Sequence, residues 1–281
     1  MNYKQNFDLY GCNTMRLHSI ARDYYEPEST EELQDLVQQL TNEKREYYIL
    51  GAGSNVILPP KINRVIIGTG LLNNEITINE HKVICGASVR IQKLIRTCQK
   101  ASIGGLEFLF SVPCFLGGAV YMNAGAGTKV SIADFIVSVK YFDPETNSIK
   151  VINKDDADFS YRHSIFQSKQ WVILCVELNL VESTFEEIEK RIQARLDFSH
   201  EKLDAGKPSC GSVFNVYNSR IIDLLKGLKI GGACYSKKKS NWISNINNAS
   251  YFDIKALIRV SEFLHHITFK PIHREIIIVK K

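Results

Sequence analysis

The sequence contains no two cysteines separated by two residues, and its seven cysteines are scattered between Cys12 and Cys234. Disulfide frameworks and zinc sites use paired, closely spaced thiols, whereas an odd and dispersed set is typical of reduced cysteines in the cytoplasm. His265 and His266 are adjacent, so they face different sides of a helix and are badly placed to chelate one ion. We therefore expect neither a disulfide framework nor a metal site.

Long apolar runs are also missing from the chain. The longest, residues 108–122, is interrupted by Pro113, Gly117 and Gly118 and is too short to span a membrane. The first ten residues are polar and lack the apolar core of a signal peptide. These two features predict a cytoplasmic protein without a membrane partner.

The charge of the chain is modest and unpatterned. Lys and Arg number 35 against 30 Asp and Glu, which gives a formal net charge of +5. There is no arginine-rich run and no basic stripe interleaved with aromatic residues, so we expect no nucleic-acid partner. The densest basic segment is Lys237–Lys239, for which both a solvated loop and a phosphate contact stay open. The excess of positive charge favours an anionic ligand.

The chain is long enough to bury a substantial core. Its 281 residues exceed one average domain, and its contents of 44% hydrophobic and 23% charged residues are ordinary for a globular protein. Apolar periodicity and capping residues predict helices at 30–40, 88–101, 186–198, 221–225 and 252–265. Strands are predicted at 47–50, 56–58, 65–67, 83–85, 135–142, 149–152, 171–180 and 275–279. This mixture indicates an α+β fold in three lobes, with the charged helix 186–198 as a connection between lobes.

Two short runs of small residues carry most of the functional signal. They are ILGAGSNV at 49–56 and SVPCFLGGAVYMNAGA at 111–126. Each joins an apolar, strand-like run to residues without bulky side chains, so backbone amides can close around a diphosphate. Two such turns in one chain predict an enzyme that holds a large phosphate-bearing cofactor between two lobes.

The first run superficially resembles the start of a dinucleotide-binding fingerprint, because Gly51 and Gly53 follow a predicted strand. That fingerprint requires a helix directly after the glycines, whose N-terminus receives the pyrophosphate. Here residues 56–58 are predicted to form another strand, and Pro59 and Pro60 block a helix. A nicotinamide-binding Rossmann fold is therefore disfavoured.

Three polar residues are candidates for chemistry. Arg162 lies in YRHSIF at 161–166, Ser212 follows a glycine in PSCGSVF at 208–214, and Glu275 precedes the apolar run IIIV. Taken alone, each has an ordinary alternative: a surface ion pair for Arg162, a turn residue for Ser212 and a strand-end charge for Glu275. A serine hydrolase is disfavoured because the GSV sequence lacks the second glycine of the nucleophile elbow, and nothing positions a histidine beside Ser212.

An ordered set of motifs resembles the MurB family of UDP-N-acetylenolpyruvoylglucosamine reductases, flavoenzymes of bacterial cell-wall synthesis. The matching segments run almost from end to end of the chain. They are NT at 13–14, LGAGSN at 50–55, GLEFL at 105–109, VPxxxGGAVxMNAGA at 112–126, YRxSxF at 161–166, SCGSVF at 209–214, IGGA at 230–233 and Glu275. The short length resembles the branch of the family that lacks an extra substrate-capping loop.

The resemblance implies an α+β, FAD-binding fold of the vanillyl-alcohol-oxidase type with a MurB-like substrate lobe. It implies FAD-binding lobes at 1–70 and 71–205, a substrate-binding lobe at 206–267 and a C-terminal strand, 268–281, that returns to the flavin. In this family NADPH reduces FAD, and the flavin then delivers hydride to the enolpyruvyl ether of UDP-N-acetylglucosamine enolpyruvate, which yields UDP-N-acetylmuramate. A monomer or weak oligomer that acts on this small UDP-sugar is expected.

The resemblance also implies roles for individual residues. Arg162 and Glu275 would stabilise the negative charge that hydride addition builds beside the substrate carboxylate, and Ser212 would donate a proton to the enolate carbon. The implied cofactor-binding residues are Gly51, Ala52, Gly53, Ser54, Asn55, Pro113, Gly117, Gly118, Asn123 and Gly125. The implied substrate-binding residues are Tyr161, Arg162, Asn215 and Lys239.

Departures from the family pattern gather on the substrate side. Gly127 stands where the family has an aromatic residue, and Asn215 stands where it usually has lysine. The pattern SxKHANFI reads SKKKSNWI at 236–243, so Lys239 replaces a histidine, and Ile277 stands where a basic residue is often found. The motifs on the flavin side match better.

Two interpretations of these departures stay open. One is a MurB enzyme whose nucleotide contacts have been rebuilt, with Lys237–Lys239 supplying phosphate-binding charge. The other is a paralogue that keeps the flavin chemistry but reduces a different enol ether or nucleotide sugar. The presence of Arg162, Ser212 and Glu275 favours the first, and it disfavours a flavin-binding protein without catalysis.

Overall fold

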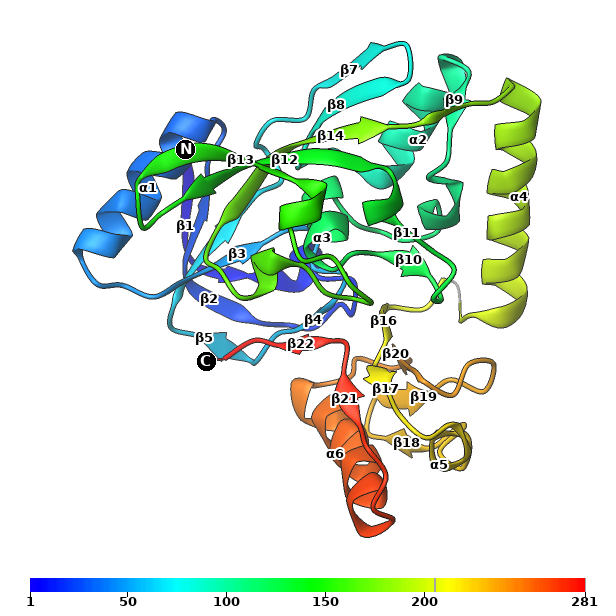
Figure 1. Ribbon diagram of the computed structural model, residues 1–281. Coiled ribbons are helices and arrows are strands. Elements are labelled where there is room, and N and C mark those ends of the chain that lie inside the picture. The colour runs from blue at the N-terminus through cyan, green and yellow to red at the C-terminus, as the bar shows by residue number, and fades with distance from the viewer. Residues whose placement is uncertain (205, 281) are drawn as a thin grey trace. The chain divides into compact units, whose positions relative to one another are not determined.

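Residues 1–204 and 206–280 are described by a computed structural model (Figure 1). Contacts between residues group the chain into two compact units. The first unit comprises Met1–Lys4, Asp23–Ala52 and Arg64–Leu196, and the second comprises Gln5–Arg22, Gly53–Asn63 and the chain from Asp197 onward. The chain therefore passes between the units several times, once within the turn at 50–55. The lobe boundaries expected from the sequence stay a prediction.

The first unit is built on a five-stranded antiparallel sheet with the strand order β13-β12-β14-β8-β7 (Figure 1). Its strands are β7 (Ile76–Asn79), β8 (Lys82–Gly86), β12 (Ile136–Asp143), β13 (Ser148–Asn153) and β14 (Val172–Asn179). Successive side chains of a strand point to opposite faces, so two central strands can serve two cores. Tyr141 and Ile173 enter one core, whereas their neighbours Phe142 and Leu174 enter the other.

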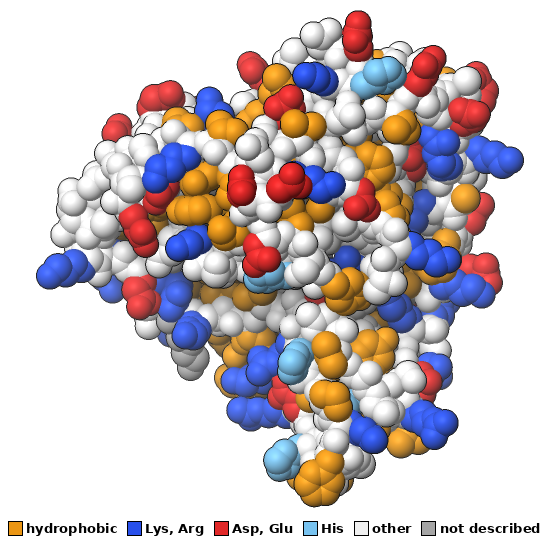
Figure 2. Space-filling model, in the orientation of Figure 1, with side chains coloured by type: hydrophobic (Ala, Val, Ile, Leu, Met, Phe, Trp, Pro, Cys, Tyr) orange, Lys and Arg blue, Asp and Glu red, His pale blue; other side chains and the backbone are white. Residues whose placement is uncertain are grey.

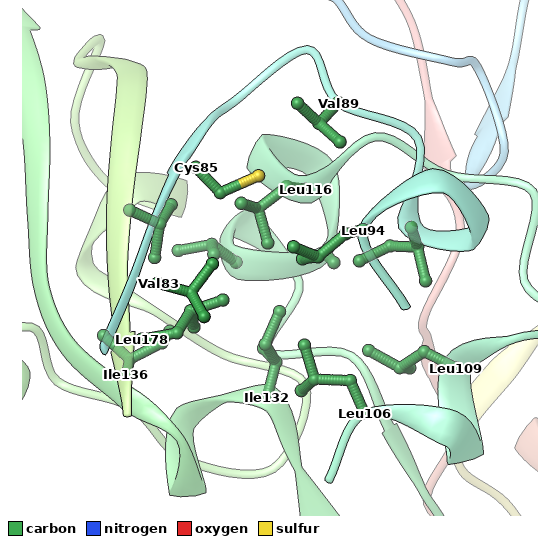
Figure 3. Close-up of a cluster of buried hydrophobic side chains, with 14 of the residues drawn as sticks. Val83, Cys85, Val89, Leu94, Leu106, Leu109, Leu116, Ile132, Ile136 and Leu178 are labelled. Atoms are coloured by element: carbon green, nitrogen blue, oxygen red, sulfur yellow. The ribbon is translucent and has the colours of Figure 1, made fainter. Parts of the chain in front are cut away.

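The larger core of the first unit lies between this sheet and two helices, α2 (Ile91–Lys100) and α3 (Leu116–Tyr121). Figure 3 shows Leu94 of α2 and Leu116 of α3 beside Val83, Cys85 and Leu178 from the sheet. All five side chains are fully buried. This core holds the run 111–126 in place, because α3 is the middle of that run.

The smaller core lies on the other face of the sheet. It is formed by α1 (Thr30–Asn42) and by two parallel strands, β3 (Tyr47–Leu50) and β6 (Val65–Gly68). Ser29 caps α1, since its side chain accepts a hydrogen bond from the Glu32 amide at 3.2 Å. The predicted apolar face of this helix is buried, and it consists of Leu33, Leu36, Val37 and Leu40. β3 leads directly into the turn at 50–55.

The second unit contains a four-stranded antiparallel sheet with the order β16-β20-β19-β18. Its strands are β16 (Ser209–Ser212), β18 (Lys229–Ile230), β19 (Ala233–Tyr235) and β20 (Trp242–Asn245). The helices are α5 (Ser219–Asp223) and α6 (Tyr251–Ile267), and α6 buries Ile254, Leu257 and Ile258 in the core of this unit. Met15 and Ile57, from two distant parts of the sequence, enter the same core.

Two short strand pairs complete the second unit. β17 (Phe214–Val216) pairs with β21 (His273–Arg274), and β4 (Val56–Ile57) pairs in parallel with β22 (Ile277–Ile278). β2 (Ile20–Glu26) crosses the boundary between units. Its first half pairs with β5 (Lys61–Ile62) in the second unit, and its second half pairs with β6 in the first. The remaining elements are β1 (Asn2–Asp8), β9 (Ile103–Gly104), β10 (Gly125–Ala126), β11 (Val130–Ser131), β15 (Val181–Glu182) and α4 (Phe185–Lys202).

The predicted elements are largely confirmed, with two corrections. The helix expected at 88–101 begins at Ile91, because the carbonyls of Ala87 and Val89 accept hydrogen bonds from the Gly117 and Leu116 amides. The strand expected at 275–279 is interrupted at its start, and only β22 forms there. The amides of Glu275 and Ile276 both donate to the Val213 carbonyl, at 2.9 and 3.4 Å, so the chain bends at this point.

The surface matches what the composition predicts. Acidic and basic side chains are interspersed on the face shown in Figure 2. Within the described part of the chain, no helix has both the length and the apolar character that crossing a bilayer requires. None of the seven cysteines, all of which lie in the described part of the chain, forms a disulfide.

Candidate active site

The turn at 50–55 depends on the conformation of Gly53. Its φ is +64°, and a Cβ placed there would lie 2.1 Å from the Cys12 carbonyl oxygen and 2.7 Å from the Asn13 Cα. The Gly53 carbonyl accepts hydrogen bonds from the Thr14 amide, at 3.1 Å, and from the Thr14 hydroxyl, at 3.3 Å. The segment 12–14 therefore lies directly against the turn and leaves no room for a side chain.

The hydrogen bonding of this turn is one-sided. The carbonyls of Leu50, Gly53 and Asn55 accept hydrogen bonds from the amides of Thr69, Thr14 and Ile277. The amides of residues 51–55, in contrast, find no acceptor among the residues that the structure describes. A turn with engaged carbonyls and available amides is suited to an anion such as a diphosphate.

The second small-residue run contains one glycine in a crowded position, Gly117, and one in an open position, Gly118. The Leu116 and Gly117 amides donate to the carbonyls of Val89 and Ala87 at 2.9 and 2.8 Å, and a Cβ on Gly117 would lie 3.0 Å from the Ala87 Cβ. A Cβ on Gly118 would meet no atom within 4 Å, and this residue is exposed. Pro113 is likewise exposed. The space over Gly118 is therefore open to a ligand.

Arg162 is fixed against the end of this run within the first unit. Its guanidinium donates to the Gly125 carbonyl at 2.9 Å and lies 4.9 Å from the centre of the Tyr161 ring. Its φ is +57°, which L residues adopt only under local constraint. Asn123 supplies part of that constraint, because its buried side chain donates to the Ser160 carbonyl at 2.7 Å. Four of the residues expected from the sequence, Tyr161, Arg162, Asn123 and Gly125, are thus brought together.

Ser212 ends β16, directly after a backbone irregularity. The register of β16 on β20 shifts between Ser209 and Ser212, and Gly211 within this bulge has φ +85°. A β-bulge changes the direction of the side chains that follow it. After this bulge, the half-buried Ser212 lies opposite Trp242 in the strand pairing. Burial, with a smaller contribution from the Glu275 carboxylate, raises the pKa of the neighbouring Cys210 thiol to about 12. Cys210 therefore stays protonated and does not compete as a nucleophile.

Glu275 lies close to Ser212 along the backbone network of the second unit. Its amide donates to the Val213 carbonyl at 2.9 Å, and its own carbonyl accepts from the Asn55 side chain at 3.0 Å. The Ile277 amide returns a hydrogen bond to the Asn55 carbonyl at 3.0 Å. The second unit thus gathers Ser212, Glu275 and the end of the small-residue turn, whereas Arg162 belongs to the first unit.

Lys239 reaches Ser212 directly. Its ammonium donates to the Ser212 hydroxyl oxygen at 3.0 Å and lies 5.3 Å from the centre of the Trp242 ring. The family resemblance implies a substrate contact for Lys239 and does not predict this hydrogen bond to Ser212. The departure from the family pattern at 236–243 was the available signal for it.

Two buried polar atoms on this side have no partner among the described residues. They are the Asn215 side-chain oxygen and the Trp242 indole nitrogen. A buried polar group without a partner costs free energy, which points to a ligand as its partner. Asn215 was expected from the sequence, but Trp242 was missed because nothing in a single sequence separates it from a core aromatic residue.

The histidine pair has an ordinary explanation. His265 is fully buried, its Nδ1 lies 2.7 Å from the Ser261 carbonyl and its Nε2 accepts from the Asn218 amide. It is a satisfied core histidine in the second unit. No group of three potential metal ligands from His, Cys, Asp and Glu occurs in residues 1–204 and 206–280.

Replacing Gly53 with alanine tests the close approach of the turn to segment 12–14. We expect Gly53→Ala to lower the free energy of unfolding by about 1–3 kcal/mol or more, because the left-handed φ is strained for alanine and the Cβ overlaps the Cys12 carbonyl. Urea denaturation measures this change. Gly11→Ala is the matched control, since a Cβ there meets nothing within 4 Å. Equal stability of the two variants would contradict the geometry.

Comparison with known protein families supports a flavin-binding assignment. The FAD binding domain family model matches residues 22–151. This range contains the turn at 50–55, the run 111–126 and most of the sheet of the first unit.

Two relatives are similar over most of the chain. The UDP-N-acetylenolpyruvoylglucosamine reductase of Borreliella burgdorferi is 36% identical over 272 residues, which are 90% of this chain and 86% of the relative. That of Caldanaerobacter subterraneus subsp. tengcongensis is 35% identical over 240 residues, with coverage of 83% and 78%.

Solved structures agree with these relatives. The crystal structure of UDP-N-acetylenolpyruvylglucosamine reductase (MurB) from Thermus caldophilus matches with a TM-score of 0.81 and 26% identity, and covers 99% of this chain and 98% of that one. Cholesterol oxidase from B. sterolicum matches 64% of this chain and 37% of its own with a TM-score of 0.50 at 14% identity, a likeness of fold alone that agrees with the predicted vanillyl-alcohol-oxidase type. The chain therefore belongs to the UDP-N-acetylenolpyruvoylglucosamine reductase (MurB) family.

Proposed function

We propose that this protein uses FAD and NADPH to reduce the enolpyruvyl ether of UDP-N-acetylglucosamine enolpyruvate to UDP-N-acetylmuramate. One observation carries the proposal. Within the second unit, the carbonyl of Val213, the residue after Ser212, accepts the Glu275 amide, and Asn55 at the end of the amide-rich turn donates its side chain to the Glu275 carbonyl. The backbone of an acidic residue thereby links the segment of a candidate proton donor to the end of a turn suited to a diphosphate.

The residues present fit FAD. The available amides of residues 51–55 are suited to its pyrophosphate, and the open space over Gly118 leaves room for a flat ligand beside α3. We assign cofactor binding to these residues together with Pro113, Gly117, Asn123 and Gly125. When bound, FAD supplies the hydride that NADPH provides.

The side chains supply the rest of the reaction. As the double bond accepts hydride, negative charge develops on the carbon beside the substrate carboxylate. Arg162 and Glu275 stabilise this charge, Arg162 through its fixed guanidinium and Glu275 through a hydrogen bond in its protonated form. Ser212 donates its hydroxyl proton to that carbon, which completes the saturated lactyl ether.

Substrate binding is assigned to Tyr161, Arg162, Asn215 and Lys239. The Asn215 side-chain oxygen is a buried acceptor without a partner in the described chain, so it is available to an N–H or O–H group of a nucleotide sugar. The Tyr161 ring is 47% exposed although it lies against the Arg162 guanidinium, so one face is available for contact.

A second candidate is a paralogue that reduces a different enol ether or nucleotide sugar. Gly127 favours it, because it stands where the family pattern has an aromatic residue and a Cβ at this position would meet no atom within 4 Å. Both candidates share the flavin chemistry, a small-molecule substrate and a cytoplasmic location, and both are compatible with a monomer or a weak oligomer.

An anaerobic absorbance experiment tests the function. The purified protein with FAD is reduced by NADPH, and UDP-N-acetylglucosamine enolpyruvate is then added. Rapid return of the oxidised flavin spectrum would support the proposed reaction. Flavin that is reduced but stays reduced would favour the paralogue, and a protein that binds no FAD would refute both candidates.

Leucine in place of Gly118 tests the cofactor site. We expect Gly118→Leu to bind FAD about tenfold more weakly, because overpacking an occupied site costs about 1–3 kcal/mol. The melting temperature of the apoprotein should not fall, since the Cβ has free space and glycine is a poor helix former. Fluorescence titration with FAD measures the affinity. Unchanged affinity would place the cofactor elsewhere.

Alanine in place of Ser212 tests the proton donor. We expect Ser212→Ala to slow flavin reoxidation by the substrate by about 10²–10⁴-fold, the range typical of a positioned acid. Reduction by NADPH should be unaffected, because it needs no proton from Ser212. Stopped-flow absorbance resolves the two half-reactions, and similar slowing of both would argue for a structural role.

The Glu275→Gln variant tests the carboxylate. The amide keeps the shape of the side chain but is a weaker hydrogen-bond donor to developing negative charge than a carboxylic acid, so we expect reoxidation to slow by about 10²-fold with reduction by NADPH unchanged. The main-chain bonds of Glu275 to Val213 and Asn55 remain available in this variant. If reoxidation proceeds at the wild-type rate, the side chain has no part in the reaction.

A further inference from the structure

The position of Lys239 is determined by a turn that begins at Ser236. The buried Ser236 hydroxyl oxygen accepts hydrogen bonds from the amides of Lys238 and Lys239, at 3.0 and 3.1 Å. A hydroxyl that accepts two successive amides reverses the chain locally. The three consecutive lysines consequently have different surroundings: Lys237 and Lys238 are exposed, whereas Lys239 is half-buried.

Two further contacts aim Lys239 at Ser212. Strand pairing places Trp242 opposite Ser212, and the ring of Trp242 lies under the Lys239 ammonium at 5.3 Å. The buried side chain of Asn241 donates to the Phe214 carbonyl at 2.7 Å and accepts from the Phe214 amide at 3.0 Å. The segments that carry Ser212 and Lys239 are therefore held together on both sides of the contact.

The contact has a defined direction. A protonated lysine is a donor only, so the Ser212 oxygen accepts at 3.0 Å and its own proton must point elsewhere. A positive charge next to a hydroxyl also stabilises the alkoxide that forms when that hydroxyl gives up its proton. Both effects make Ser212 a better acid than an isolated serine.

We propose that Lys239 is the positioning residue of the proton-donation step: it orients the Ser212 hydroxyl toward the substrate and stabilises the resulting alkoxide. This inference rests on the proposed function, because it concerns the proton that Ser212 donates there. It also changes the interpretation of the basic segment. Lys237 and Lys238 remain candidates for phosphate contacts, whereas Lys239 is engaged with Ser212.

The step is balanced in protons and charge. The O–H bond of Ser212 breaks and a C–H bond forms at the substrate carbon, which removes the negative charge from that carbon and leaves it on the Ser212 oxygen. The Lys239 ammonium then passes a proton to that oxygen and recovers one from water. The pair returns to its starting state after each turnover.

The contact itself is tested without any activity measurement. In NMR spectra of protein labelled with ¹³C at lysine Cε, the Lys239 resonance is identified as the signal that is absent from the spectrum of Lys239→Arg. We expect this resonance to move in Ser212→Ala and to stay in place in Ser240→Ala, the control in the adjacent turn. An unchanged Lys239 resonance in Ser212→Ala would overturn the inference, whatever the protein reduces.

Stopped-flow kinetics test the consequence. We expect Lys239→Met to slow flavin reoxidation at saturating substrate by about 10²-fold while the substrate concentration at half-maximal rate changes little. Lys239→Arg keeps a positively charged hydrogen-bond donor, so its rate of flavin reoxidation should be at least about tenfold higher than that of Lys239→Met. Lys255→Met is the matched control, because Lys255 belongs to the second unit and its ammonium also lies near an aromatic ring, 5.4 Å from the centre of the Tyr251 ring.

Failure of the proposed reaction and failure of the Lys239 role give different results in these experiments. A wild-type protein whose reduced flavin is not reoxidised by the substrate refutes the proposed function, and the lysine resonance still reports on the contact. If the wild type is active, a normal reoxidation rate in Lys239→Met refutes the positioning role. A weaker substrate affinity with an unchanged maximal rate also refutes it and returns Lys239 to substrate binding alone.

Discussion

The arrangement of the second unit depends on the carbonyl of Val213, which accepts the amides of both Glu275 and Ile276. This pair of hydrogen bonds bends the chain after β21 and brings the end of the sequence back beside Ser212. Asn55 then holds the same segment from the other side, through its side chain and its carbonyl. The segments that carry the proposed proton donor, the acidic residue and the end of the diphosphate turn are thus held together by hydrogen bonds to main-chain carbonyls.

The glycines of the two small-residue runs fall into two classes. Gly53 lies where the Cys12 carbonyl approaches too closely for a side chain, so packing alone requires it, and at Gly117 a Cβ would be crowded against the Ala87 Cβ at 3.0 Å. Gly118 faces open space, and neither its φ nor its neighbours require glycine. A glycine that the fold does not need is best explained by a ligand that occupies the space, which is why Gly118 is the more informative of the two adjacent glycines.

The substrate side shows how several substitutions can act together. Lys239 replaces the histidine of the family pattern, and Trp242 replaces the phenylalanine at the penultimate position of the same motif. In the structure the wider indole ring supports the ammonium, and strand pairing places both next to Ser212. The change from histidine to the more flexible Lys239 is therefore accompanied by a change to Trp242, whose ring restricts the position of the Lys239 ammonium. Such coupling is expected when a proton donor must keep one orientation.

The sequence by itself determined the secondary structure wherever the apolar pattern was long, as in α1, α6, β12 and β14, because local periodicity specifies the buried face. It also determined the family, through motifs that run along the whole chain. It did not reveal α3, whose two glycines hide a short helix that only packing against the sheet stabilises. Nor did it reveal the bend at Glu275 or the contact between Lys239 and Ser212. Residues 27 positions apart meet there because β16 pairs with β20, and pairing between distant strands is decided by tertiary structure alone.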